Sequence, residues 1–149
     1  MFDIASTCRA VQAHLRDSDL FASVEIERPL EPPGEGPSAT IHCESMRVAE
    51  TTLQSAIEVH VLAVRIYQGQ FADGREVTEI QGAELVSKVL DLFYEDFTFG
   101  ARVRAVDVAG MYGTGLSASW TDEDVSEQPV HLAEITLPII VDSATSFAA

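Results

Sequence analysis

The sequence is short of basic residues. Lys88 is its only lysine, and nine lysines and arginines stand against 24 acidic residues, which gives a formal net charge of −15. Binding to a nucleic-acid backbone or to an anionic membrane depends on lysine and arginine, so this charge argues against both partners. Two interpretations remain: the charge keeps the protein in solution, or it repels nucleic acid while other faces contact protein. Composition does not separate them.

Long apolar runs and cysteines are also scarce. No segment approaches the roughly 18 consecutive apolar residues of a membrane-spanning helix, and the longest apolar stretch, Val59–Ile66, contains a histidine and an arginine. The start, Met1–Ile4, lacks the basic region and cleavage site of a secretory signal, so we expect a cytoplasmic origin. Cys8 and Cys43 make no disulfide framework, and we expect both to be buried as small apolar side chains.

Motifs for phosphate binding, nucleophilic catalysis and calcium binding are missing. Gly110–Gly115 has neither the lysine nor the glycine spacing of a phosphate loop, and a predicted strand follows it, so we predict a hairpin turn. Ser117 does not stand in the GxSxG pattern of a nucleophile elbow. The acidic segment Asp122–Glu127 lacks the glycine of an EF-hand. We predict that it is an acidic hairpin loop, with adventitious Mg²⁺ or Ca²⁺ binding as the alternative.

The four histidines, His14, His42, His60 and His131, show no zinc-ligand spacing. His42 and Cys43 are neighbours on a predicted strand and therefore face opposite sides of the sheet. His42 and His60 could meet across paired strands, where we expect surface polar residues rather than a metal site. Among 24 acidic residues no catalytic carboxylate pair can be chosen. We therefore predict no enzyme, and no catalytic, cofactor-binding or metal-ligating residue.

Length and apolar content predict one ordered domain over residues 1–149, since 149 residues with 46% apolar side chains suffice for a single core. Apolar residues at helical spacing predict a helix over Ile4–Leu15, which ends at Asp17–Asp19. A capping box with Thr78 as N-cap and Gln81 at N3 predicts the start of a second, longer helix. Its predicted apolar stripe contains Ile80, Ala83, Val86, Val89, Leu90, Phe93 and Phe97.

Alternating apolar and polar residues predict the strands. They are Val24–Ile26, Ile41 to about Val48, Ser55–Tyr67, Val103–Ala109, Leu116–Trp120 and about Val130–Val141. Ser55–Tyr67 becomes apolar on both faces, so we expect it in the middle of the sheet. Pro138 indicates an edge or a bulge in the last strand. The whole predicts an α+β fold, with a mixed or antiparallel β-sheet packed against an N-terminal helix and one main amphipathic helix.

Segment 29–37 contains four prolines and two glycines. No regular element survives that density of breakers, so we predict a loop or arm. It is either a linker or a contact segment that becomes ordered on assembly.

The order of these elements resembles the tail terminator proteins of long-tailed, siphophage-type bacteriophages. The resemblance is greatest in Val106–Gly113 (VDVAGMYG) followed by His131–Val141 (HLAEITLPIIV), and it extends to the N-terminal helix and the early Pro-rich loop. It implies a structural virion protein that forms a ring, usually of six subunits, on the completed tail tube. The ring stops tube polymerisation and joins the head-side connector, while DNA passes through without specific binding.

The same resemblance implies assembly in the host cytoplasm, a final position at the head-proximal end of the tail, and neither catalysis nor a cofactor. The nearest alternative is another neck, tail-completion or tail-tube subunit. A small-molecule-binding or enzymatic α+β domain is the alternative from a different class, and a buried polar pocket with converging groups would favour it.

Overall fold

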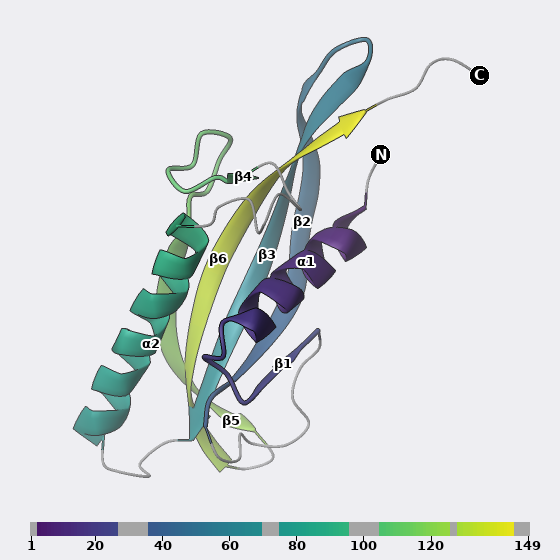
Figure 1. Ribbon diagram of the computed structural model, residues 1–149. Coiled ribbons are helices and arrows are strands. Elements are labelled where there is room, and N and C mark those ends of the chain that lie inside the picture. Colours follow the sequence, from purple (N-terminus) through teal and green to yellow (C-terminus); the bar gives the residue numbers. More distant parts are fainter. Residues whose placement is uncertain (1–2, 27–35, 70–74, 96–104, 126–127, 145–149) are drawn as a thin grey trace.

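The computed structural model describes residues 3–26, 36–69, 75–95, 105–125 and 128–144. Within these residues six strands form one mixed sheet, and two helices cover one of its faces (Figure 1). In chain order the elements are α1 (Ile4–Asp17), β1 (Ser23–Glu25), β2 (Ser38–Thr51), β3 (Ser55–Gly69), α2 (Arg75–Glu95), β4 (Ala105–Val106), β5 (Ser117–Val125) and β6 (Gln128–Ala144). The predicted α+β class, with two helices on one mixed sheet, is confirmed.

The sheet is organised around its two longest strands. Strand β3 pairs with β2 on one side and with β6 on the other, and its partners in β6 run from Val130 to Ala144. The central position predicted for this strand is therefore confirmed. On the far side of β6 lie β5 and β4, one after the other. Only the β1–β2 pair is parallel among the described strands.

Helix α1 follows its predicted pattern. The Asp3 carboxylate caps the helix by accepting the Ser6 backbone N–H at 3.1 Å. Its buried face carries Cys8, Val11 and Leu15, whose spacing of three and four residues places them over one another. The helix ends at Asp17, as the sequence indicated.

Helix α2 differs from its prediction at both ends. It begins at Arg75, so Thr78 lies inside the helix and is not its N-cap; Phe97 lies outside the described residues. Ile80 is 53% exposed. It precedes the buried Val86 by six residues, which at 3.6 residues per turn places it about 120° around the helix from that face. Ala83 is exposed too, so the buried stripe is narrower than predicted.

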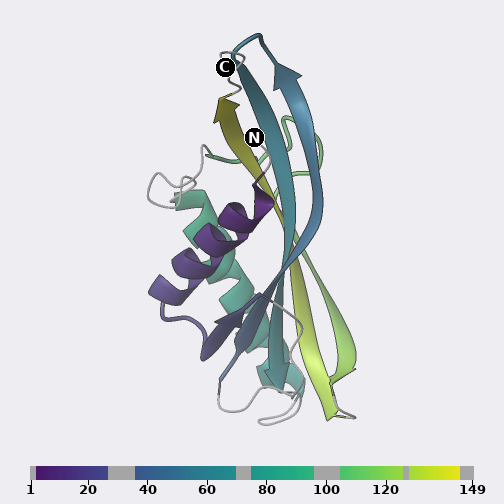
Figure 2. The same ribbon diagram turned by 90° about the vertical axis from the view of Figure 1, so that its right-hand side faces the viewer.

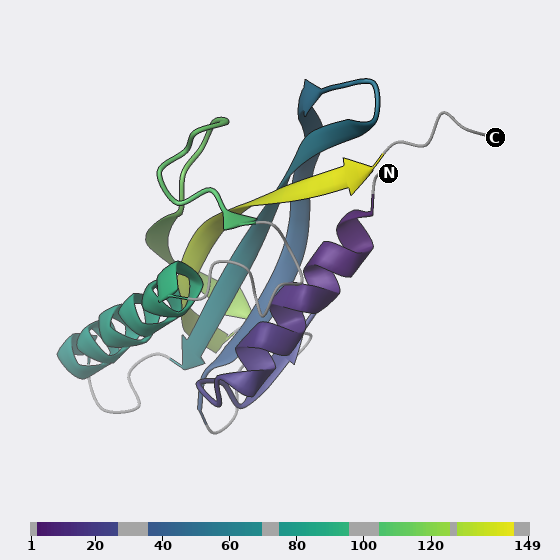
Figure 3. The same cartoon turned by 45° about the horizontal axis from the view of Figure 1, so that its top comes forward.

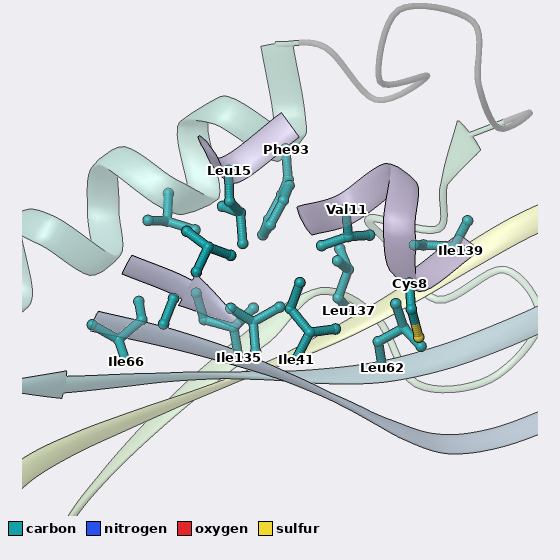
Figure 4. Packing of buried hydrophobic residues seen from close by; sticks show 14 of the residues in the cluster. Cys8, Val11, Leu15, Ile41, Leu62, Ile66, Phe93, Ile135, Leu137 and Ile139 are labelled. Atoms are coloured by element: carbon teal, nitrogen blue, oxygen red, sulfur yellow. The ribbon is translucent and has the colours of Figure 1, made fainter. Parts of the chain in front are cut away.

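The core lies between the two helices and the sheet (Figure 4). Leu15 of α1 and Phe93 of α2 are both fully buried, and the His14 and Phe93 rings stack with their centroids 6.4 Å apart. Beneath them the sheet contributes side chains from β2, β3 and β6. These include Ile41, Leu62, Val64, Ile66, Ile135, Leu137 and Ile139.

Pro138 occupies an interior strand, so the predicted edge or bulge is wrong. It pairs with Val61 of β3, and its carbonyl accepts the Asp107 N–H at 2.9 Å on the opposite side of β6. Because the N–H and C=O of a residue in an antiparallel strand point the same way, the missing N–H faces away from β3. On that side β6 pairs with β5 only as far as Thr136, and its pairing with β4 starts at Ile139. Pro138 lies between these two partners, so its missing N–H removes no ladder hydrogen bond.

The acidic hairpin loop predicted over Asp122–Glu127 is shorter than expected. The hairpin is present, but β5 continues to Val125 and pairs with the start of β6, and 126–127 lie outside the described residues. Asp122 and Asp124 are thus strand residues, held in place by the ladder despite their low β-propensity. At the other end, the predicted strand Val103–Ala109 is reduced to Ala105–Val106, with 103–104 outside the described residues. Val24 of β1 is buried as expected, whereas Ile26 is 39% exposed.

A long hairpin extends from the body of the domain. Strands β2 and β3 continue past the N-terminal end of α1, and their turn lies farther from α2 than any other part of the described sheet (Figures 1 and 3). The turn closes at Thr52, whose backbone N–H donates to the Ser55 carbonyl at 2.7 Å. We call residues 44–57 the β2–β3 arm.

Candidate assembly surfaces

The outer edge of β2 is open along most of its length. Strand β1 pairs with Ser38, Ala39 and Thr40 only, and no described strand covers the same edge from Ile41 to Thr51. Open edges present unpaired N–H and C=O groups that a further strand can pair with. This edge is therefore a surface on which another polypeptide can extend the sheet.

Apolar side chains are exposed on the same arm. Leu53 at the turn is 84% exposed, and Met46 and Val48 of β2 are 38% and 42% exposed. Single exposed apolar residues are ordinary, and these three are of interest because all of them lie on one projecting hairpin. The charged residues of the arm on β2 are Glu44, Arg47 and Glu50, so both signs are present.

The opposite edge of the sheet is open as well. Strand β5 pairs with β6 on its inner side, and no described strand lies on its outer side. Trp120 is 45% exposed there, and Asp122 and Asp124 are exposed farther along the strand. The two open edges therefore differ in chemistry, because the β5 edge is acidic with an aromatic residue and the β2 edge carries mixed charge.

Segment 107–116 is not the hairpin that the sequence predicted. Strands β4 and β5 both run antiparallel to β6, so they point in the same direction and do not pair with each other. The segment between them is an excursion whose base is closed by the Leu116 N–H donating to the Val108 carbonyl at 3.0 Å. It lies on the face of the sheet away from the helices, at the right in Figure 2. There Gly113 lies beside the Arg47 guanidinium of β2.

Asp107 organises this excursion. It is 4% exposed, and its two carboxylate oxygens accept the N–H groups of Met111 at 2.7 Å and Tyr112 at 2.9 Å. Gly110 has φ +79°, and an added Cβ there would lie 2.6 Å from the Gly113 carbonyl oxygen, so only glycine fits. The excursion is thus a fixed loop that presents Met111, which is 77% exposed. In the sequence, an aspartate followed by a glycine three residues later favours such a turn, and this spacing could have predicted the loop.

Thr7, His60 and Glu58 form a buried polar network that joins α1 to β3. The Thr7 Oγ1 lies 2.8 Å from His60 Nδ1, and His60 Nε2 lies 3.0 Å from Glu58 Oε1. Hydroxyl, imidazole and carboxylate occur in this order in catalytic triads. Here Thr7 is 4% exposed and the other two are 1% exposed, which leaves a substrate no space beside the hydroxyl. The network fixes the position of α1 on the sheet. The expectation that His60 is a surface residue was wrong.

The remaining histidines lie apart from one another. His42 pairs with Ala63 rather than His60, and its Nε2 lies 2.8 Å from Thr40 Oγ1. His131, which is 6% exposed, lies between two carboxylates: its Nδ1 is 3.0 Å from Asp122 and its Nε2 is 3.4 Å from Glu79 of α2. Among the described residues, no group of three or more His, Cys, Asp or Glu is arranged to hold a metal ion.

Gly82 permits the close approach of α2 to this histidine. A Cβ at Gly82 would lie 2.6 Å from Gln68 Oε1 and 3.2 Å from His131 Cδ2. The approach of Glu79 to His131 therefore depends on a glycine inside a helix, which the sequence analysis did not single out.

The two cysteines meet, although they are 35 residues apart. Cys8 of α1 and Cys43 of β2 have their sulfur atoms 2.9 Å apart. Cys8 is buried as expected, whereas Cys43 is exposed, which corrects the prediction for that residue. Ser117, also considered from the sequence, is an exposed residue at the start of β5.

Neither described helix is long and apolar enough to cross a membrane. No family description and no curated protein matches the sequence. Among solved structures, the chain is similar to the sheath/tube terminator in the extended state of PVC, an extracellular contractile injection system determined by cryo-electron microscopy. The TM-score is 0.43 at 12% identity, over 100% of this chain and 63% of the other. The chain thus spans less than two thirds of that protein's length, and the likeness is too remote to establish a family.

Proposed function

We propose that this protein is a structural tail subunit whose copies join edge to edge into a ring that caps a tail tube, as do the tail terminators that its sequence resembles. The observation that carries the proposal is the presence of two open and chemically different sheet edges, β2 and β5, on opposite sides of one sheet. Contact between unlike edges of successive copies is heterologous, and such contacts close into a ring when the rotation between copies allows it.

The projecting β2–β3 arm fits this arrangement. It carries the open edge away from the helices, so a neighbouring strand can approach without meeting α1 or α2 (Figure 3). Its exposed residues Met46, Val48 and Leu53 would be covered by the neighbour, which gives the contact an apolar centre. The ring of six subunits, the joining to the head-side connector and the head-proximal position at the end of the tail belong to the same proposal.

Electrostatics oppose closure of such a ring. Each copy carries a formal charge of −15, and the β5 edge brings Asp122 and Asp124 to the contact. Charges on neighbouring copies interact over about 30 Å at 0.01 M salt but only about 8 Å at 0.15 M. If apolar and backbone contacts hold the ring, assembly strengthens as NaCl is raised or when millimolar Mg²⁺ bridges acidic side chains. Dissociation on adding salt would instead show an interface made of salt bridges.

The ring is tested by sedimentation velocity and negative-stain microscopy of the protein alone and with purified tail tubes. We expect rings, and tubes that end in one ring and grow no further when tube protein is added. Long tubes made by this protein alone would replace the proposal with a tail-tube role. A protein that remains monomeric at every salt concentration and leaves tube ends bare would refute it.

A matched pair of variants assigns the contact to the arm. Leu53→Glu places a charge on the arm, and Ile80→Glu places the same charge on an exposed apolar position of α2. Both sites are solvent-exposed, so both variants should fold. We expect Leu53→Glu to raise the protein concentration needed for ring formation at least tenfold, and Ile80→Glu to leave that concentration unchanged. Equal behaviour of the two variants would exclude the arm from the interface.

A further inference from the structure

The Cys8 and Cys43 thiols lie close together but differ in their exposure to solvent. Cys8 is 2% exposed and points from α1 toward the sheet beside Leu62, as Figure 4 shows. Cys43 is exposed on β2, opposite Leu62 in the strand register, and so lies on the face that α1 covers. Their sulfur atoms are 2.9 Å apart. A disulfide needs an S–S distance of about 2.0 Å, so a side-chain movement of about 0.9 Å would join them.

We propose that Cys8 and Cys43 are a redox modification site, which closes into an internal disulfide between α1 and β2 when the protein meets a small-molecule disulfide such as oxidised glutathione. In reducing surroundings the pair stays a dithiol. This inference rests on the geometry of one chain and does not depend on ring formation.

The order of the two chemical steps follows from exposure. Cys43 is the thiol that solvent reaches, so its thiolate attacks the small disulfide, forms a mixed disulfide and releases one small thiol. Cys8 then attacks the Cys43 sulfur, and the second small thiol leaves with the Cys8 proton. Two protein thiols are oxidised to one disulfide while one small disulfide is reduced to two thiols. Burial and the contact with Cys43 raise the pKa of Cys8 to about 12, which keeps it from reacting first.

The bond would pin α1 to the sheet beside the β2–β3 arm. Without the disulfide, α1 is held on the strands by apolar packing and by the Thr7–His60 contact. The side chains of Gln12 and Arg16 also donate to the Val24 carbonyl, each at 3.0 Å. The disulfide would close a loop from residue 8 to residue 43, which contains β1 and the Pro-rich segment 29–37. A loop of this length restricts the unfolded chain strongly, so the oxidised protein should be more resistant to heat.

Mass spectrometry of the full chain provides the direct test. After incubation with oxidised glutathione, we expect the intact mass to fall by two hydrogen atoms without a bound glutathione. Trypsin cuts after Arg9, Arg16 and Arg47, whereas the Arg28–Pro29 bond resists it. The expected product is therefore peptide 1–9 linked to peptide 17–47, and reduction should separate the two.

Thermal melting supplies a second measurement. We expect a rise of about 5–12 °C in Tm on oxidation of the parent, from the usual stabilisation by a loop-closing disulfide in a chain of this size. Cys8→Ser and Cys43→Ser should show no such rise. The matched control combines Cys43→Ser with Ser45→Cys, because Ser45 pairs with Val61 and faces the other side of the sheet. That variant should form only a mixed disulfide with glutathione.

Three results would overturn the proposal. The first is a parent that stops at a stable mixed disulfide on Cys43. The second is a parent whose main product is a dimer linked through Cys43. The third is an internal disulfide that forms equally well in the Ser45→Cys control, since that would show a flexible segment rather than a preformed pair.

Discussion

Phe93 tests how the two helices are joined to the sheet. It is fully buried in the last turns of α2, where it lies in the core with Leu15 and stacks against the His14 ring of α1. Phe93→Ala removes the ring and leaves a cavity between both helices and the strands. The neighbouring Tyr94 is 66% exposed on the same helix, so Tyr94→Ala is a control with a similar loss of side-chain volume.

The expected cost of Phe93→Ala is about 3–5 kcal/mol of unfolding free energy, because lost apolar transfer and an unfilled cavity add together. The unfolding entropy of a 149-residue chain is about 310 cal/mol/K, from about 2.1 cal/mol/K per residue. Dividing the two gives a fall in Tm of about 10–16 °C. Tyr94→Ala should change the unfolding free energy by about 0.5 kcal/mol or less.

Urea denaturation followed by circular dichroism measures these free energies, and calorimetry measures Tm. The purified variants should be compared at one protein concentration, since assembly would stabilise the folded state. Equal losses in the two variants would refute the reasoning, because they would show that α2 does not present Phe93 to the core.

Three further predictions concern groups outside this contact. Glu58→Leu should cost about 1–3 kcal/mol by leaving His60 without its acceptor, and adding His60→Leu should recover part of that loss, as a double-mutant cycle in urea would measure. Gly82→Val should lower Tm by several degrees because its side chain would meet His131, whereas Ala83→Val at the exposed neighbour should not, as melting curves would decide. Replacing segment 29–37 with a Gly/Ser linker of equal length should leave Tm nearly unchanged yet weaken assembly in sedimentation; a large loss of Tm would place the segment in the core.

Much of the fold could be predicted from local patterns. The spacing of apolar residues in Ile4–Leu15 predicted α1 to within its observed end, because helical periodicity and the Asp17–Asp19 stop are encoded side by side. The change in Ser55–Tyr67 from one apolar face to two predicted the central strand, since only a strand with neighbours on both sides and cover on its faces needs such a composition. The width of the buried stripe of α2 was overestimated, because Ile80 matched the helical period only loosely and lies off the buried face.

The candidate assembly surfaces could not be predicted in the same way. Whether an edge is open depends on which strands fail to pair with it, and that is a property of the whole sheet. The acids of β5 read as a loop because aspartate disfavours strands, yet pairing with β6 placed them on an edge. Pro138 read as an edge residue because proline lacks an N–H, yet a gap between β4 and β5 left that position without a required donor.

The sequence by itself determined the fold class, the acidic charge and the absence of known catalytic and metal-binding motifs, since these depend on composition and on residues close together in the chain. The tertiary structure determined which side chains distant in the sequence contact one another. Cys8 and Cys43 looked like two unrelated apolar residues, and His60 like a surface residue, until α1 packed across β2 and β3. The physical reason is that contacts across long sequence separations are fixed by the packing of whole elements, and no local pattern records them.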